Sequence, residues 1–249
     1  MLNIIVQTLR LASPTTGRGR PPTSTSDQRH NRATASARAS LGDTDRRSSR
    51  LCEISKSIAN CSSCQLSATR KNAVPGEGNP SWILLVGEAP GFHEDQKGRP
   101  FVGPAGQFLD ELLSIAGIKR DSVFITNVLK CRPPQNRTPS AEEISSCRPH
   151  LDAQLAAIEP RLICTLGAVA LRTLLASGSV TRSRGRPIIR SGIVYFPTLH
   201  PAASLYDPNL KDVLREDFRL LGQLVRTGPD DLEAYLARAS GLRTLDSFS

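Results

Sequence analysis

The stretch WILLVGEAPG, residues 82–91, joins a short apolar run to a glycine-rich turn. Three similar apolar runs follow it, at residues 123–125, 162–166 and 193–196. Apolar residues at helical spacing lie between and after these runs, at residues 106–116, 141–158, 168–175 and 207–225. Short strands that alternate with helices predict an α/β fold, in which helices cover both faces of a parallel sheet.

The carboxyl ends of parallel strands meet at one edge of a sheet, and ligands bind in the crevice outside that edge. The loops expected at this rim follow Val86, Ile125, Leu166 and Phe196. Three of these loops carry polar motifs, which contain Glu88, Asn127 and His200. A carboxylate, an amide and an imidazole that converge at one rim predict a single site, although each alone is more often structural.

Four of the six cysteines have the spacing of a metal site. They form a C-x2-C pair and two later single cysteines, Cys61, Cys64, Cys131 and Cys147. Four thiolates suit a tetrahedral zinc ion or a cubane iron-sulfur cluster, and the spacing leaves both open. Cys52 lies in a helical pattern and Cys164 in a buried strand, so both fit such a site less well.

The charge of the chain is distributed unevenly. Residues 1–50 hold nine Arg, no Lys and three acids, and thus +6 of the net charge of +9. Their Ser, Thr, Pro and Gly content predicts a disordered basic tail, either a transit peptide or, as we favour, an extension. We expect one folded domain at residues 51–226 and a polar C-terminal tail at residues 227–249. No run approaches the roughly 18 apolar residues of a membrane span, so a cytoplasmic protein is expected.

A glycine-rich segment, residues 98–106, precedes the first predicted helix. Glycines allow close backbone approach, and a helix start offers amides to an anion, so a phosphate-binding turn is one interpretation. The other interpretation is a tight connection between a strand and a helix. The segment matches neither a Walker loop nor a Rossmann fingerprint.

Together these motifs resemble the family 4 uracil-DNA glycosylases. The segments that carry the resemblance are residues 87–91, 94–95, 98–106, 127–134 and 200–201, within about residues 51–225. The resemblance implies a three-layer α/β/α sandwich with a four-stranded parallel sheet. It also implies a [4Fe-4S] cluster on the four spaced cysteines, and thereby favours iron over zinc.

The implied activity is excision of uracil from single- or double-stranded DNA by hydrolysis of its N-glycosidic bond, the first step of base excision repair. A monomer without membrane contact is expected. The enzyme must flip the nucleotide out of the stack, which costs less for a mispaired uracil. The resemblance implies that Glu88 acts at the sugar and that His200 stabilises the departing uracil anion.

The resemblance also implies substrate-binding residues. Phe101 would stack on uracil, Asn127 would read its edge, and Glu94 would exclude the methyl group of thymine near C5. The remaining expected substrate-binding residues belong to the first turn, Gly87, Ala89 and Gly91. Ala89 stands where other uracil glycosylases have an Asp that activates water, which leaves the general base open.

The segment after His200 also departs from the family. Many members have two Leu and an Arg where this chain has Ser204, Leu205 and Tyr206. Leu205 can still fill the gap that a flipped base leaves, but an Arg contact to phosphate is lost, so weaker duplex binding is expected. Arg70 and Lys71, after the cysteine pair, are expected to meet phosphates instead.

Two rival functions are considered. One is an iron-sulfur relative that traps uracil DNA covalently, but that subgroup has a basic, His-containing loop that residues 132–139 lack. The other is a metal-binding module that holds nucleic acid without catalysis, which would keep the cysteines without needing Glu88, Asn127 and His200 together.

Overall fold

The structure is a computed structural model that describes residues 26–176 and 178–240. The chain divides into two units, Met1–Leu41 and Gly42–Ser249, and the sheet with its helices belongs to the second. Residues 1–25, half of the predicted basic tail, lie outside the described residues, as do residues 241–249 of the C-terminal tail. Within the described ranges, no helix has the length and apolar character needed to cross a membrane.

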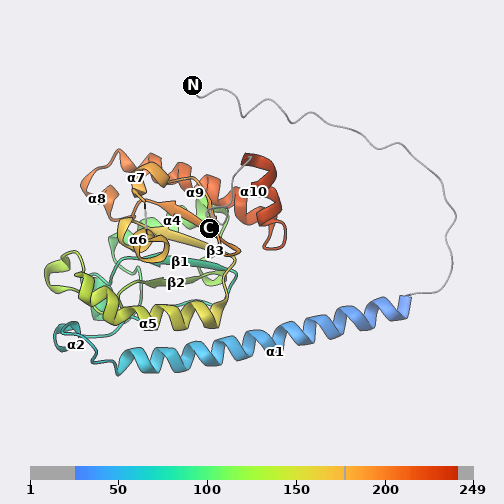
Figure 1. Ribbon diagram of the computed structural model, residues 1–249, viewed down its shortest axis with the longest axis horizontal. Coiled ribbons are helices and arrows are strands. Elements are labelled where there is room, and N and C mark those ends of the chain that lie inside the picture. Colours follow the sequence, from blue (N-terminus) through green and yellow to red (C-terminus); the bar gives the residue numbers. More distant parts are fainter. Residues whose placement is uncertain (1–25, 177, 241–249) are drawn as a thin grey trace. The chain divides into compact units, whose positions relative to one another are not determined.

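The fold is built on one twisted sheet (Figure 1). Its strands are β1 (Ile83–Gly87), β2 (Phe124–Asn127), β3 (Leu162–Leu166), β4 (Ile188–Arg190) and β5 (Ile193–Thr198). They lie in the order β2-β1-β3-β5-β4. The first four strands in this order run parallel, as expected, and β4 pairs antiparallel with β5.

The prediction of four strands was therefore wrong, because the sheet has five. The additional strand, β4, is a three-residue edge strand with only two apolar residues, too short for a periodic pattern to reveal it. Its connection to β5 is a two-residue turn, in which Ser191 has φ 50° and Gly192 has φ 73°. Two consecutive positive φ values are typical of the tight turns that join antiparallel strands.

Helices cover both faces of the sheet, which confirms the three-layer α/β/α arrangement. On one face the strands pack against α4 (Pro104–Ala116), α9 (Leu210–Thr227) and α10 (Leu232–Ser240). On the other they pack against α5 (Ala141–Ile158), α6 (Ala168–Leu175) and, through Leu51 and Ile54, α1 (Ser26–Ala59). Figure 1 shows α5 and α9 on different sides of the strands.

Side chains of one strand alternate between these two layers, as the pleat requires. Leu85 belongs to the core cluster of α4 and α9, whereas Leu84 and Val86 belong to that of α5 and α6. All three are fully buried, so the strand reads as a continuous apolar run. The shorter helical elements are α2 (Leu66–Thr69), α3 (Phe92–Lys97), α7 (Val180–Ser183), α8 (Ala203–Tyr206) and two 3₁₀ turns, η1 (Arg120–Ser122) and η2 (Pro134–Asn136).

Helix α1 is longer than the sequence pattern indicated. The predicted helical residues Leu51 and Ile58 are buried, but the helix begins at Ser26. Arg47, in the predicted tail, donates hydrogen bonds to the carbonyl of Ile158 at 2.6 Å and to Glu159 at 2.7 Å. These bonds explain why packing extends before residue 51, since they satisfy the carboxyl end of α5.

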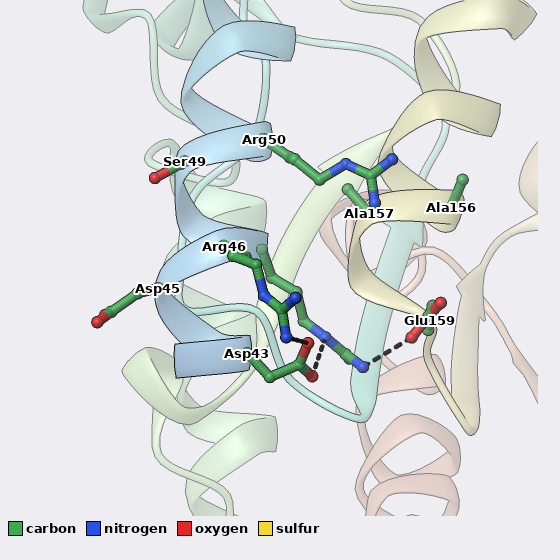
Figure 2. Close-up of a pocket in the computed structure, with 9 residues that line it drawn as sticks. Asp43, Asp45, Arg46, Ser49, Arg50, Ala156, Ala157 and Glu159 are labelled. Atoms are coloured by element: carbon green, nitrogen blue, oxygen red, sulfur yellow. Dashed lines mark hydrogen bonds and ion pairs between the residues drawn. The ribbon is translucent and has the colours of Figure 1, made fainter. Parts of the chain in front are cut away.

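The cavity at this junction holds about 550 Å³ and is lined by charged residues of α1 and the end of α5. Arg47 forms ion pairs with Asp43 at 3.0 Å and with Glu159 at 2.7 Å. Figure 2 draws dashed lines to these two labelled carboxylates. Arg46 also pairs with Asp43. These charges largely neutralise one another, and no rim motif contributes to the cavity.

Helix α10 lies within the predicted C-terminal tail. Its residues Leu232 and Leu236 are 1% and 4% exposed and join the core cluster of α4 and α9. This helix was not predicted from the polar sequence, because two apolar residues four positions apart are a weak helical signal.

Candidate active site

The three rim motifs meet around one cavity of about 500 Å³. Glu88 follows β1, Asn127 ends β2, and His200 comes two residues after β5. The cavity is lined by seven of the eight predicted catalytic and substrate-binding residues, namely Glu88, Ala89, Gly91, Glu94, Phe101, Asn127 and His200. The eighth, Gly87, lies behind Asn127 and Phe101.

Asn127 is 1% exposed, and its side-chain oxygen is buried without a hydrogen-bond partner among the described residues. A buried amide oxygen without a partner costs free energy unless a ligand satisfies it. Gly87 makes this placement possible, because a Cβ at that residue would lie 2.3 Å from the Asn127 oxygen and 2.7 Å from the Phe101 ring. Asn127 lines the cavity and therefore holds a buried acceptor that no described residue satisfies.

Phe101 forms the second wall in a strained conformation. Its φ of 51° is in the left-handed region, which is uncommon for a bulky residue and is often found at functional sites. Its ring stacks on His200 with centroids 5.6 Å apart and planes at 27°. Gly106 accommodates this turn, since a Cβ there would lie 1.9 Å from the Phe101 carbonyl oxygen. The glycine-rich segment thus serves to place the ring.

His200 is held in one protonation form. Its Nδ1 accepts a hydrogen bond from the backbone N–H of Ala202 at 3.2 Å. Burial lowers the pKa of His200 to about 4, although the nearby Glu94 carboxylate opposes this shift. An imidazole that accepts at Nδ1 and is neutral carries its proton on Nε2, which is then a donor.

Glu88 is half-buried, and no hydrogen bond or ion pair to its carboxylate occurs among the described residues. Burial raises the pKa of Glu88, while the positive charge of Arg172 on α6 lowers it. A carboxylate in this setting is available to a ligand, since it is not committed to the protein.

Glu94 has a different environment from the one expected. Its carboxylate accepts hydrogen bonds from the backbone amides of Gly91, Val102 and Gly103 at 3.1, 2.8 and 2.9 Å. Two of these amides lie in the segment that the sequence suggested for a phosphate. Since a carboxylate of the protein binds two amides of this segment, the contacts favour the other interpretation, a tight connection between a strand and a helix. Through these hydrogen bonds Glu94 joins the turn after β1 to the glycine-rich segment at residues 98–106.

Lys130 was missed by the sequence interpretation, because lysine is rarely buried without a carboxylate partner. It is 1% exposed, and its Nζ donates to the hydroxyl of Thr126, the carbonyl of Asn127 and the side-chain oxygen of Gln154 at 2.7, 2.6 and 2.7 Å. Burial lowers its pKa to about 7. Its place three residues after Asn127 and directly before Cys131 is the signal that could have identified it. It ties the end of β2 to α5.

The four spaced cysteines come together in part beside this strand end. Cys131 and Cys147 are buried in one small cluster, and Cys64 packs against it together with Ala89 of the active-site turn. Cys61 lies close enough to affect the pKa of Cys131 electrostatically. Cys52 and Cys164 take no part in this cluster.

The donor set fits an anionic metal cluster. Burial raises the pKa values of Cys131 and Cys147, the latter to about 11, so a bound cation would be needed to hold them as thiolates. Arg70 donates to the Cys131 sulfur at 3.0 Å and to the carbonyl of Ala59 at 2.8 Å. Arg70 is thus engaged at the cysteines, contrary to its expected role at phosphates. Within the described ranges, no three His, Cys, Asp or Glu residues are grouped so as to hold a single metal ion.

Comparison with known proteins shows the family of the chain. The family model of the Uracil DNA glycosylase superfamily matches residues 75–221, which include all three rim motifs. The type-4 uracil-DNA glycosylase of Sulfurisphaera tokodaii is 46% identical over 70% of this chain and 84% of its own length. The enzymes of the same name from Saccharolobus solfataricus and Archaeoglobus fulgidus are 43% and 42% identical, each over 74% of this chain and over 90% and 98% of their own lengths.

These matches span more than half of the chain and most of each relative. The range matched by the family model includes the turn after β1, the end of β2 and the segment after β5, which line the cavity. The chain therefore belongs to the uracil DNA glycosylase superfamily and, within it, to the type-4 uracil-DNA glycosylases.

Proposed function

We propose that this protein is a uracil-DNA glycosylase, which flips uracil out of DNA and hydrolyses its N-glycosidic bond to begin base excision repair. The observation that carries the proposal is the buried side-chain oxygen of Asn127, a residue that lines the cavity, because this oxygen has no partner among the described residues. Uracil offers N3–H beside the O4 acceptor, and the Asn127 amide can satisfy both with its oxygen and its NH₂.

Loss of the base leaves negative charge on uracil, and His200 is suited to stabilise it. Its Nδ1 is engaged by the amide of Ala202, so Nε2–H is available to donate to a carbonyl oxygen of the departing base. The neutral imidazole can make this hydrogen bond, because Nε2 carries its proton. The Phe101 ring, stacked on His200, would cover one face of the uracil.

The sugar becomes positively charged as the bond breaks, and a carboxylate stabilises it. The cavity is lined by two carboxylates, Glu88 and Glu94, and Glu94 already accepts three backbone hydrogen bonds. We therefore assign to Glu88 both stabilisation of the sugar cation and acceptance of the proton of the attacking water. This assignment supplies the general base that Ala89 cannot provide.

We propose that Cys61, Cys64, Cys131 and Cys147 hold a [4Fe-4S] cluster. When bound, it would supply a rigid tie between the segment after α1 and the sheet. The packing of Ala89 against the cysteines supports a structural role, because that contact would fix the turn that carries Glu88. The cytoplasmic location and the monomeric state expected from the sequence stay predictions.

The proposal is tested with an oligonucleotide that contains one uracil, scored for alkali-labile abasic sites. The wild-type protein should produce them, and Glu88→Gln should slow their formation by two or more orders of magnitude. Glu142→Gln, an exposed change on α5, is the matched control and should react like the wild type. A wild-type protein that leaves every uracil in place would overturn the proposal.

A further inference from the structure

Exposed apolar side chains gather at the mouth of the active-site cavity. Among the described residues, four large hydrophobic side chains are exposed: Phe92 (51%), Leu205 (51%), Tyr206 (90%) and Tyr235 (37%). The first three line the cavity that contains Asn127 and His200. Clustered exposed apolar surface marks a binding site more often than single exposed residues do.

The first exposed ring is paired with a cation. The guanidinium of Arg132 lies 5.2 Å from the centroid of the Phe92 ring, and its Nε donates to the side-chain oxygen of Asn136 at 2.7 Å. Within the described ranges, Arg132 forms no ion pair with a carboxylate. The positive charge is thus held in place without being neutralised. A ring beside an available guanidinium complements a nucleotide, because the ring can stack on a base while the cation meets a phosphate.

The second exposed ring comes from a different element. Tyr206 is the last residue of α8, which begins three residues after His200. Ser204 anchors this helix, since it is 1% exposed and its hydroxyl donates to the carbonyl of Pro201 at 2.8 Å. Leu205 and Tyr206 therefore project from a fixed support.

We propose that Phe92 and Tyr206 stack on the two bases that flank the flipped uridine, so that the mouth recognises an unpaired DNA strand. The inference rests on the proposed function, because Phe92 and Tyr206 both line the cavity that would hold the uridine. In a duplex the flanking bases are already stacked and paired, so the rings can contribute less there. Base stacking on aromatic side chains tolerates any sequence, as a repair enzyme requires.

The test measures equilibrium binding of a labelled single strand that carries 2′-fluoro-2′-deoxyuridine, whose base resists departure. Three strands are compared: one with both flanking bases, one abasic on the 5′ side and one abasic on the 3′ side. Phe92→Ala and Tyr206→Ala should each raise Kd about tenfold on the complete strand. The increase in Kd caused by each variant should disappear on the strand that lacks the base on which that ring stacks. One ring should depend on the 5′ flanking base and the other on the 3′ flanking base.

Further variants separate stacking from structural effects. Phe92→Tyr keeps a ring and should restore binding. Tyr235→Ala removes an exposed ring of α10 that does not line the cavity, and should leave Kd unchanged on every strand. On a duplex of the same sequence, both mouth variants should lose less affinity than on the single strand.

The inference is overturned if the losses persist on both abasic-flanked strands, or if they are as large on the duplex as on the single strand. Either result would assign the rings to protein packing or to another partner. Uracil release by the wild type is measured separately. If the affinity losses depend on the flanking bases but the wild type releases no uracil, the proposed function alone is overturned. If the wild type releases uracil but the losses do not depend on the flanking bases, this inference alone is overturned.

Discussion

Nδ1 of His200 accepts a hydrogen bond from the backbone amide of Ala202, 3.2 Å away. This contact fixes the imidazole as a neutral donor through Nε2, and burial favours the same form by lowering the pKa to about 4. The residue is therefore in its active form over a wide pH range, because a His of ordinary pKa, about 6.5, would become charged below that value.

We predict that the single-turnover rate of uracil excision shows no step near pH 6.5. The protonated form of His200 should become significant only as the pH falls toward 4. Burial raises the pKa of Glu88, so its protonation should lower the rate before the pH falls that far. Rates measured between about pH 5.5 and 8 check this. A step near pH 6.5 that disappears in His200→Gln would show that the imidazole titrates normally.

The same residue should make a large contribution to the rate. His200→Ala removes the donor to the departing base and should slow excision by about a hundred- to a thousandfold, as loss of one oxyanion-type donor does. His200→Gln keeps an N–H donor and should lose less. Equal losses in the two variants would contradict the role of Nε2–H.

Gly87 should be as important as the polar residues, although it touches no substrate in the proposed mechanism. Gly87→Ala would place a Cβ 2.3 Å from the Asn127 oxygen and 2.7 Å from the Phe101 ring, so one of these side chains must move. Displacement of about 1 Å can reduce a rate about a hundredfold. Gly42→Ala is the control, since a Cβ there meets nothing within 4 Å. Comparable kcat/KM for both variants would show that the cavity adapts.

The cysteine site predicts a specific metal content. The purified protein should be brown with about four irons, and Cys147→Ser should lose iron and thermal stability together. Cys164→Ala is the matched control, because Cys164 is a buried thiol of β3 outside the cysteine cluster, and it should keep the iron. Stoichiometric zinc in an anaerobic preparation, or a Cys147→Ser protein with full iron content, would contradict the assignment.

The sequence predicted most of the fold because its signals were local. Helix α5 coincides with residues 141–158, since Ser140 and Glu143 form a capping box that marks its start. Helix α4 begins at Pro104, two residues before the predicted start, because proline at the first helical position continues the glycine-rich turn. The edge strand β4 was missed, since three residues carry no measurable period.

The site was harder to predict wherever a role depends on contacts between distant segments. That Asn127, Glu88 and His200 would share one rim followed from the parallel direction of the predicted strands. The use of Glu94 to bind the amides of Val102 and Gly103 depends on how two turns fold together, which no local pattern reports. The burial of Lys130 likewise depends on oxygens from Thr126 and Gln154, and Gln154 lies 24 residues from Lys130 in the sequence.

The central claim is that Asn127 reads the base, and its exchange for Asp tests this most directly. Cytosine offers an N3 acceptor beside an N4–H₂ donor, so the wild-type amide in the same pose would meet donor with donor. Buried unpaired groups cost roughly 1–3 kcal/mol each, enough to exclude cytosine when two are mismatched. Asp replaces the amide donor with an acceptor suited to N4–H₂.

The measurement compares single-turnover excision by the wild type and Asn127→Asp on U:G and C:G oligonucleotides. The predicted result is a loss of at least about a hundredfold on uracil, with a trace of cytosine excision that the wild type lacks. Undiminished uracil excision by Asn127→Asp would contradict the account, because it would show that the base is read elsewhere than at this residue.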